Sequence, residues 1–279
     1  MSFKASLIQM RSGVDMARNL ADASAMIREA VAQGAQYVLT PEMTNIFEAD
    51  RERLKSLVRS EEEDACAAGF SQLAKELGIW LHVGSLALRV SEDKLVNRSL
   101  LFSPDGSLAA RYDKIHLFDV DMPSGERIRE SDTFAPGDEA VVVALPWGNL
   151  GLSICYDMRF PKLYNILANA GAMFMAVPAA FTVPTGQAHW HVLLRSRAIE
   201  TGSFVFAAAQ GGAHECGRKT FGHSLVVTPW GEIVAELDTE PGALVFDVDE
   251  ELVKRDRGRI PALKNARAFN LKPTGGMVI

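Results

Sequence analysis

The chain lacks the sequence features of several large protein classes. Its 279 residues include only three cysteines, Cys66, Cys155 and Cys216, which are too few and too irregularly spaced for a disulfide framework. Lys and Arg number 29 against 35 for Asp and Glu, so the net charge is −6 and the basic surplus typical of nucleic-acid binders is missing. The longest strongly apolar run, residues 172–181, is far shorter than the roughly 18 residues that a membrane-spanning helix needs. We therefore expect a cytoplasmic protein with reduced thiols and neither a membrane nor a nucleic-acid partner.

Common cofactor and metal motifs are also missing. The chain has no Gly-x-x-x-x-Gly-Lys-Ser/Thr phosphate loop, no Gly-x-Gly-x-x-Gly loop and no His-Glu-x-x-His motif. His189 and His191 stand two positions apart on a predicted helix, so they point in different directions. His214 and Cys216 share one loop but lack the further ligands that zinc requires. The sequence thus predicts no metal and no cofactor.

What the chain does contain is an alternation of helices and strands. Apolar residues recur at a helical period from 15 to 33, between β-rich runs at 3–10 and 37–40. Further predicted helices cover 61–77, 161–170 and 187–201, and further strands or hairpins lie within 80–86, 99–112, 140–154, 172–177, 204–209, 225–236 and 243–248. No Pro- or Ser-rich linker and no repeat of about 20 to 50 residues divides the chain. Because hairpins interrupt the βαβ rhythm, we expect one α/β domain with mixed sheets and outer helices.

One predicted strand ends at a cysteine. In the segment 151–161 the strand reaches Cys155, a short loop follows, and Pro161 opens a helix. Such a turn can expose a thiol beside backbone N–H groups that stabilise an anion. Because a thiol is a good nucleophile only as the thiolate, this site would need a base or a cation nearby. A buried structural cysteine after a core strand fits the same spacing.

Two charged residues have the same position at the end of a strand. Glu42 follows the strand at 37–40, and Lys114 follows the hairpin at 99–112. Each residue taken singly fits a solvated charge beside an apolar strand. Together with Cys155, they supply the thiol, the proton-transferring carboxylate and the oxyanion-binding cation that a cysteine amidase needs.

These three segments, in this order, resemble the nitrilase superfamily of carbon–nitrogen hydrolases. Further segments that carry the resemblance lie at 129–137, 185–190, 195–200 and 222–231, so that it covers about residues 3–250. Residues 114–119 (KIHLFD) and 155–160 (CYDMRF) are similar to the small-amidase branch, which contains ω-amidases and deaminated-glutathione amidases. The AIET at 198–201 and the AAAQ at 207–210 favour the second of these two types.

The resemblance implies a fold, an assembly and a set of roles. The fold would be a four-layer α-β-β-α sandwich, joined through helices into a homodimer or higher homo-oligomer, without metal or cofactor. Glu42 would be the general base, Lys114 the oxyanion-stabilising lysine and Cys155 the nucleophile. Glu130 would be a second glutamate that hydrogen-bonds within the site, and the backbone N–H of Tyr156 would join Lys114 in stabilising the oxyanion.

Several other residues have two interpretations. Phe47, Phe181 and Trp190 either line the acyl pocket or pack in the core. Arg159 and Arg195 either meet a substrate carboxylate or form ion pairs that brace the fold.

The predicted function is hydrolysis of a small carboxylate-bearing amide to an acid and ammonia through a Cys thioester. Deaminated glutathione or a 2-oxo ω-amide such as α-ketoglutaramate is the expected substrate class. The alternatives are an N-carbamoyl-amine hydrolase and a catalytically idle binding member of the same fold. Residues 1–250 would form the hydrolase domain, and 251–279 a C-terminal helix and tail at a docking site or dimer interface.

Overall fold

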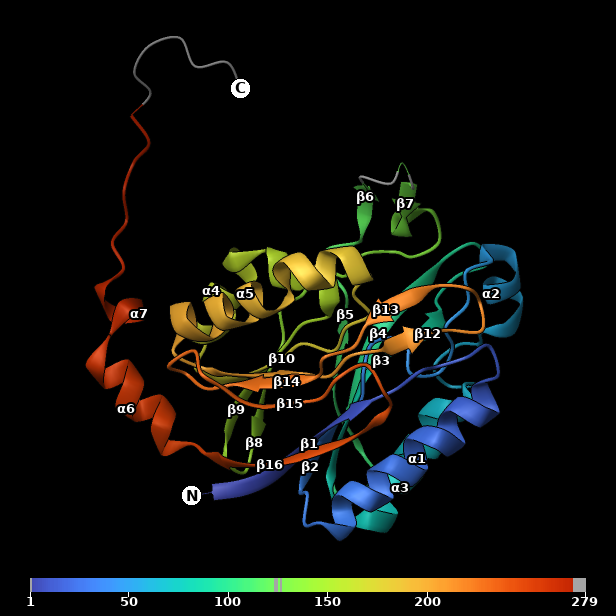
Figure 1. The fold of residues 1–279 in the computed structure, drawn as a ribbon, viewed down its shortest axis with the longest axis horizontal. Coiled ribbons are helices and arrows are strands. Elements are labelled where there is room, and N and C mark those ends of the chain that lie inside the picture. Colours follow the sequence, from blue (N-terminus) through green and yellow to red (C-terminus); the bar gives the residue numbers. More distant parts are fainter. Residues whose placement is uncertain (1, 123–124, 126, 273–279) are drawn as a thin grey trace.

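The computed structural model, which describes residues 2–122, 125 and 127–272, is a sandwich of two sheets between two layers of helices (Figure 1). Helices α1 (Met16–Ala32) and α3 (Ala65–Leu77) cover one sheet. Helices α4 (Pro161–Asn169) and α5 (Val183–Thr201) cover the other. The predicted four-layer α-β-β-α architecture with mixed sheets is confirmed.

Each sheet has six strands and a parallel centre. The first has the order β16-β1-β2-β3-β4-β5, in which β1, β2 and β3 run parallel and the outer pairs are antiparallel. Its strands are β1 Ser2–Gln9, β2 Tyr37–Leu39, β3 Trp80–Arg89, β4 Leu95–Phe102, β5 Leu108–Asp113 and β16 Gly242–Asp249. The second has the order β15-β14-β11-β10-β9-β8, with β9, β10 and β11 parallel. Its strands are β8 Val142–Leu145, β9 Gly148–Leu152, β10 Ala172–Ala176, β11 Phe204–Ala207, β14 Leu225–Val227 and β15 Ile233–Glu236.

Several short helices and strands lie outside the two main sheets and the four helices that cover them, and the sequence predicts few of them. They are α2 Arg51–Leu57, β6 Asp119–Asp121, β7 Arg127–Arg129, the 3₁₀ helices η1 Glu130–Asp132 and η2 Cys155–Arg159, β12 Gly211–Ala213, β13 Lys219–Phe221, α6 Glu251–Arg259 and α7 Ala262–Asn265. Most are too short to show a hydrophobic period, which is the signal that reveals longer helices and strands.

The alternation of side chains along each strand divides the core into layers. On β1 and β2, Leu7 and Leu39 point between the sheets, where they join residues of the second sheet such as Phe206. Their neighbours Ile8 and Val38 point to the other face and pack beneath α1 and α3. Because both faces are covered, all three residues of β2 are apolar and buried.

Two helices begin at other residues than predicted. Helix α3 begins at Ala65 rather than 61, because Asp64 is its N-cap and accepts a hydrogen bond from the Ala67 N–H at 2.8 Å. Helix α5 begins at Val183 rather than 187, because Pro184 fits its first turn.

A glycine lets the two sheets approach each other beside the strand ends. A Cβ atom on Gly84 of β3 would lie 2.0 Å from the Thr40 carbonyl oxygen and 2.4 Å from the Pro178 side chain. Thr40 follows β2 of the first sheet and Pro178 follows β10 of the second, so the missing side chain allows their close contact. Thr40 lies two positions before Glu42 in the sequence, so this contact is close to Glu42 along the chain.

The C-terminal segment leaves the body of the domain. After α6 and α7 the chain continues through exposed residues 266–272, and Figure 1 shows this stretch running away from the sandwich. The assignment of 251–279 to a docking site or dimer interface therefore stays a prediction, and 273–279 lie outside the described residues. None of the helices in the described ranges combines the length and apolar character that crossing a bilayer requires.

Candidate active site

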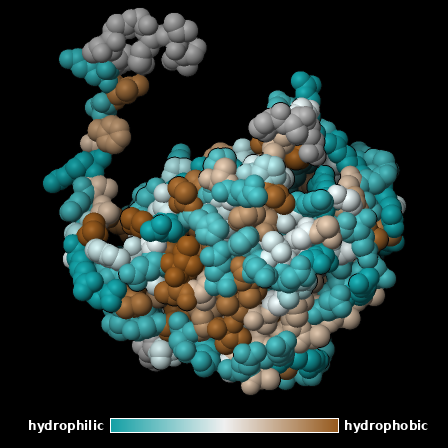
Figure 2. All heavy atoms as spheres, in the orientation of Figure 1, coloured by the Kyte–Doolittle hydropathy of each residue, from teal (hydrophilic) through white to brown (hydrophobic). Residues whose placement is uncertain are grey.

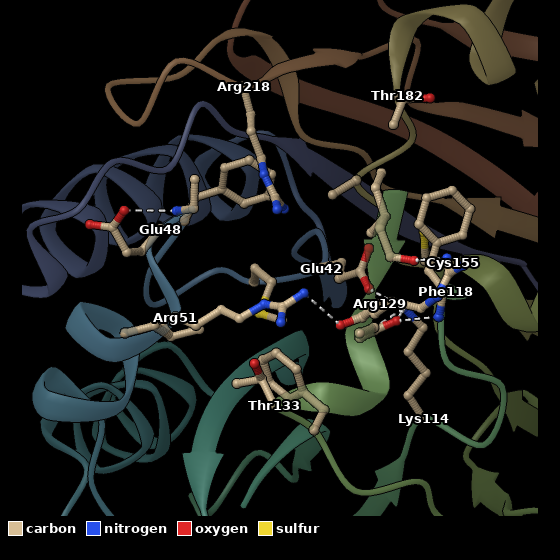
Figure 3. A pocket seen from close by; sticks show the side chains of 18 of the residues that line it. Glu42, Glu48, Arg51, Lys114, Phe118, Arg129, Thr133, Cys155, Thr182 and Arg218 are labelled. Atoms are coloured by element: carbon tan, nitrogen blue, oxygen red, sulfur yellow. Dashed lines mark hydrogen bonds and ion pairs between the residues drawn. The ribbon is translucent and has the colours of Figure 1, made fainter. Parts of the chain in front are cut away.

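A pocket of about 180 Å³ opens where strand ends of both sheets meet (Figure 3). Glu42 comes from the loop after β2, Lys114 directly follows β5, and Cys155 comes from the turn after β9. Glu130 joins them from η1. All four predicted residues line this one pocket although 113 positions separate the first from the last in sequence (155 − 42).

The Lys114 ammonium lies between two carboxylates. Its Nζ atom is 2.9 Å from Glu42 Oε1 and 2.9 Å from Glu130 Oε2, and its side chain is only 3% exposed. Burial alone would lower the pKa of Lys114, but the charges of Glu130 and Glu42 outweigh it and hold that pKa well above its ordinary value. The lysine therefore carries its positive charge at neutral pH.

An asparagine that the sequence analysis does not single out fixes both carboxylates. The Asn97 amide of β4 donates to Glu42 Oε1 at 2.8 Å and to Glu130 Oε1 at 3.3 Å. The backbone N–H of Phe118 also donates to Glu130 Oε2, at 2.6 Å. Asn97 is buried within β4, and both of its acceptors lie in segments distant in sequence, so no local sequence pattern singles it out.

Cys155 begins the 3₁₀ helix η2 with a left-handed backbone, φ +49°. A non-glycine residue in this region is strained and is held there by its surroundings, which here include a hydrogen bond from its own N–H to the Pro178 carbonyl at 2.8 Å. Burial raises the pKa of the Cys155 thiol well above its ordinary value; the Glu42 carboxylate raises it further, whereas the Lys114 ammonium lowers it. The resting group is thus a thiol, and a base would have to take its proton before the sulfur could act as a nucleophile.

A further buried carboxylate holds the turn that carries Cys155. Asp157 accepts hydrogen bonds from the Tyr112 hydroxyl at 2.6 Å, from the Ile154 N–H at 2.9 Å and from the His116 N–H at 3.0 Å. Asp157 is fully buried, so these donors replace the water that its charge loses. It ties β5 and the loop after Lys114 to the turn that carries Cys155, a link that local sequence patterns do not reveal.

Tyr156 occupies the second position of η2. A backbone N–H at this position has no acceptor within its own helix, so it can bind an anion beside the Cys155 sulfur. This is the arrangement that the expected role of the Tyr156 N–H requires.

The residues expected to bind substrate fall into two groups. Phe47 and Phe181 line the pocket. Trp190 does not: it is 1% exposed, packs behind Phe181 at 5.0 Å between ring centroids, and belongs to the core. Arg159 is also not among the lining residues; its guanidinium lies over the rings of Phe181 and Tyr156, at 5.5 and 5.9 Å from their centroids, and braces the turn.

Four arginines at the mouth of the pocket are not predicted from the sequence. Arg51 donates to Asp132 at 2.6 Å. Arg127 and Arg129 both form ion pairs with Asp121 of β6, at 3.4 and 2.7 Å. Arg218, from the β12–β13 loop, reaches down over the pocket in Figure 3. Within the part of the chain that the structure describes, no group accepts a hydrogen bond from its guanidinium or forms an ion pair with it.

Comparisons with known proteins give the family context of this pocket. Residues 4–257 match the family model described as carbon-nitrogen hydrolase. Over 264 residues the chain is 39% identical to a protein of Yersinia enterocolitica named deaminated glutathione amidase, covering 94% of this chain and 92% of that protein. Over 275 residues it is 37% identical to the omega-amidase NIT2 of Homo sapiens, covering 96% of each.

A solved structure shares the fold. The NitFhit protein of C. elegans superposes with a TM-score of 0.90 at 35% sequence identity, over 95% of this chain. The match spans 65% of that longer chain.

Removing the buried ammonium should destabilise the protein in a pH-dependent way. Lys114→Met leaves two buried carboxylates without their cation, and we expect a loss of about 3–5 kcal/mol in the free energy of unfolding near pH 8. Because protonation relieves an unpaired buried carboxylate, this loss should shrink as the pH falls to about 5. Urea unfolding at both pH values measures it, with the exposed Lys162→Met on α4 as the control. A loss of equal size at both pH values would contradict the electrostatic role.

Proposed function

Because the chain belongs to the carbon–nitrogen hydrolase family, we propose that its pocket hydrolyses a small carboxylate-bearing amide to an acid and ammonia. The curated relatives at 37% and 39% identity are named omega-amidase and deaminated glutathione amidase, which supports a small amide as the substrate. The observation that carries the proposal is one pocket in which a buried thiol, a carboxylate and an ammonium lie together.

The first half of the reaction makes a thioester. Glu42 takes the proton of Cys155 while the sulfur attacks the amide carbonyl carbon. The resulting oxyanion binds to the Lys114 ammonium and to the Tyr156 N–H. Protonated Glu42 then gives its proton to the leaving nitrogen, the C–N bond breaks, and ammonia departs.

The second half releases the acid. Glu42 takes a proton from water, the water oxygen attacks the thioester carbon, and the C–S bond breaks. The proton then returns to the sulfur, which restores the thiol and the carboxylate. Lys114 does not exchange its proton in this cycle, because its raised pKa keeps it charged. Glu130 is a positioning residue, since it contacts the Lys114 ammonium with both of its oxygens, at 3.0 and 2.9 Å.

An ammonia-release screen tests this function. Deaminated glutathione, α-ketoglutaramate, N-carbamoyl amino acids and nitriles form the panel, and we expect turnover of at least one carboxylate-bearing amide. Cys155→Ala and Glu42→Gln should each lower kcat at least about 10³-fold, because nucleophile and base act as one unit. Cys216→Ala, in the β12–β13 loop, is the matched control and should keep full activity.

Each other result of this screen has a definite meaning. Preferred turnover of carbamoyl amino acids, with release of carbon dioxide, would replace the amidase by an N-carbamoyl-amine hydrolase. Inertness toward the whole panel would favour an idle binding member of the fold. Substantial turnover by either active-site variant would remove that residue from its role.

Arg218 is the residue that we propose binds the substrate carboxylate. The other three arginines of the mouth already pair with carboxylates or backbone oxygens of the chain, whereas Arg218 faces the pocket without such a partner among the described residues. A guanidinium binds a carboxylate through two parallel hydrogen bonds. The amide carbon would then lie at Cys155 and the anionic end of the substrate at the mouth.

Arg218→Gln should weaken binding of the substrate carboxylate without affecting the amide group at Cys155. We expect KM to rise about tenfold for a carboxylate-bearing amide, since a hydrogen bond to a charged group is worth roughly 1.5–3 kcal/mol. KM for a neutral amide of the same length should not change. Lys219→Gln, at the adjacent exposed position, is the control. Equal effects on the charged and the neutral amide would rule out carboxylate recognition by Arg218.

We further propose that the chain forms a homodimer through α4 and α5 in the cytoplasm. Exposed apolar side chains on these helices support the interface: Ile166 of α4, and Val192 and Ile199 of α5. Figure 2 shows more apolar side chains on the neighbouring face around β15, where Val234 is exposed.

A thiol nucleophile works where thiols stay reduced, which supports the proposed cytoplasmic location. Sedimentation of the full chain and cell fractionation check the two statements.

A further inference from the structure

Away from the pocket, three potential ligand atoms converge at the second sheet. They are Nε2 of His191 on α5, Nδ1 of His223 in the β13–β14 connection and a carboxylate oxygen of Glu236 on β15. Both ring nitrogens lie 2.8 Å from Glu236 Oε1, and all three atoms lie within 4.8 Å of one another. None of the three residues lines the pocket of Cys155.

The backbone holds the His223 ring in place for this contact. His223 has a left-handed backbone, φ +58°, which is uncommon for a residue other than glycine. Its N–H donates to the Asp238 carbonyl at 2.8 Å, and its carbonyl accepts from Trp190 Nε1 at 2.8 Å. Its ring stacks on Phe221 at 4.3 Å between centroids. The imidazole is thus fixed before any ligand arrives, which lowers the entropic cost of binding one.

The donor set selects a class of cation. Two imidazole nitrogens and one carboxylate oxygen suit zinc and similar borderline divalent ions, which bind such atoms at about 2.0–2.2 Å. Calcium and magnesium prefer sites made of oxygens alone. The three side chains are about one third exposed, so water can reach a bound ion and complete its coordination. One ion between the three atoms would replace the two hydrogen bonds that now share a single carboxylate oxygen.

We propose that His191, His223 and Glu236 bind one zinc-class divalent cation, which ties α5 to the β14–β15 hairpin. The role would be structural, because the pocket thiol does not belong to this cluster. Thr182 and Thr185 at the start of α5 line the Cys155 pocket, so by fixing α5 the cation would also restrict the motion of this side of the pocket. His189 and His191 do diverge as their spacing predicts, since His189 Nδ1 accepts from Arg159 instead. The two residues that would bind the cation together with His191 come from other elements, so their spacing in the sequence does not reveal the site.

Zinc titration by calorimetry tests the site. The full chain is used in the Cys155→Ala background, which removes the reactive thiol as a competing zinc ligand. We expect one zinc per chain. Glu236→Gln and His223→Asn should each weaken binding at least about tenfold, because loss of a ligand costs at least as much as loss of a ligand's own hydrogen-bond partner. Asparagine tolerates the left-handed backbone of His223, so that variant keeps its fold.

Controls separate this site from zinc bound elsewhere. His189→Gln, on the same helix and outside the cluster, should bind zinc as the parent does. Zinc should raise the melting temperature of the parent and of this control but not that of Glu236→Gln. Cobalt in place of zinc should show no sulfur-to-metal charge-transfer band, which excludes Cys66 and Cys216 as ligands. Zinc affinity unchanged in both ligand variants, or no binding by the folded parent, would overturn the proposal and leave the cluster as a hydrogen-bonded bridge only.

Discussion

The active site depends on one buried ammonium between two carboxylates. Lys114 contacts Glu42 and Glu130 at 2.9 Å each, in a place that water hardly reaches. Burying one of these charges alone would be costly, and their mutual contact offsets this cost together with the hydrogen bonds from the Asn97 amide and the Phe118 N–H. The same contact fixes the Glu42 carboxylate beside the thiol. The Lys114–Glu42 contact therefore both stabilises the buried charges and sets the position of the proposed base.

The sandwich brings these groups together because it places strand ends of two sheets at one point. Glu42 and Lys114 follow strands of the first sheet, and Cys155 follows a strand of the second. Gly84 permits the contact between the sheets at this point, and Asp157 ties the nucleophile turn to β5. The strands form the rigid core of the site, and the residues proposed to carry out the chemistry follow where the strands end.

The sequence predicts the features that depend on local patterns. The order of helices and strands follows from periodicity. The motifs around Glu42, Lys114 and Cys155 resemble a family whose fold implies the four-layer architecture, and both the family and the architecture are confirmed. Contacts between distant segments are not predictable in this way. Nothing in the local sequence marks Asn97 or Asp157, because their hydrogen-bond partners lie mainly in other loops and turns. Trp190 fits both a pocket and a core in sequence, and only its burial behind Phe181 decides for the core.

The most direct test of the thiol mechanism is to find the acyl group on the protein. The full chain is mixed with a small carboxylate-bearing amide that it hydrolyses and quenched in acid within milliseconds, and its peptides are then mapped by mass spectrometry. We predict that the peptide containing Cys155 gains the mass of the substrate minus ammonia. An acyl group on another residue, or none during steady ammonia release, would contradict nucleophilic attack by Cys155.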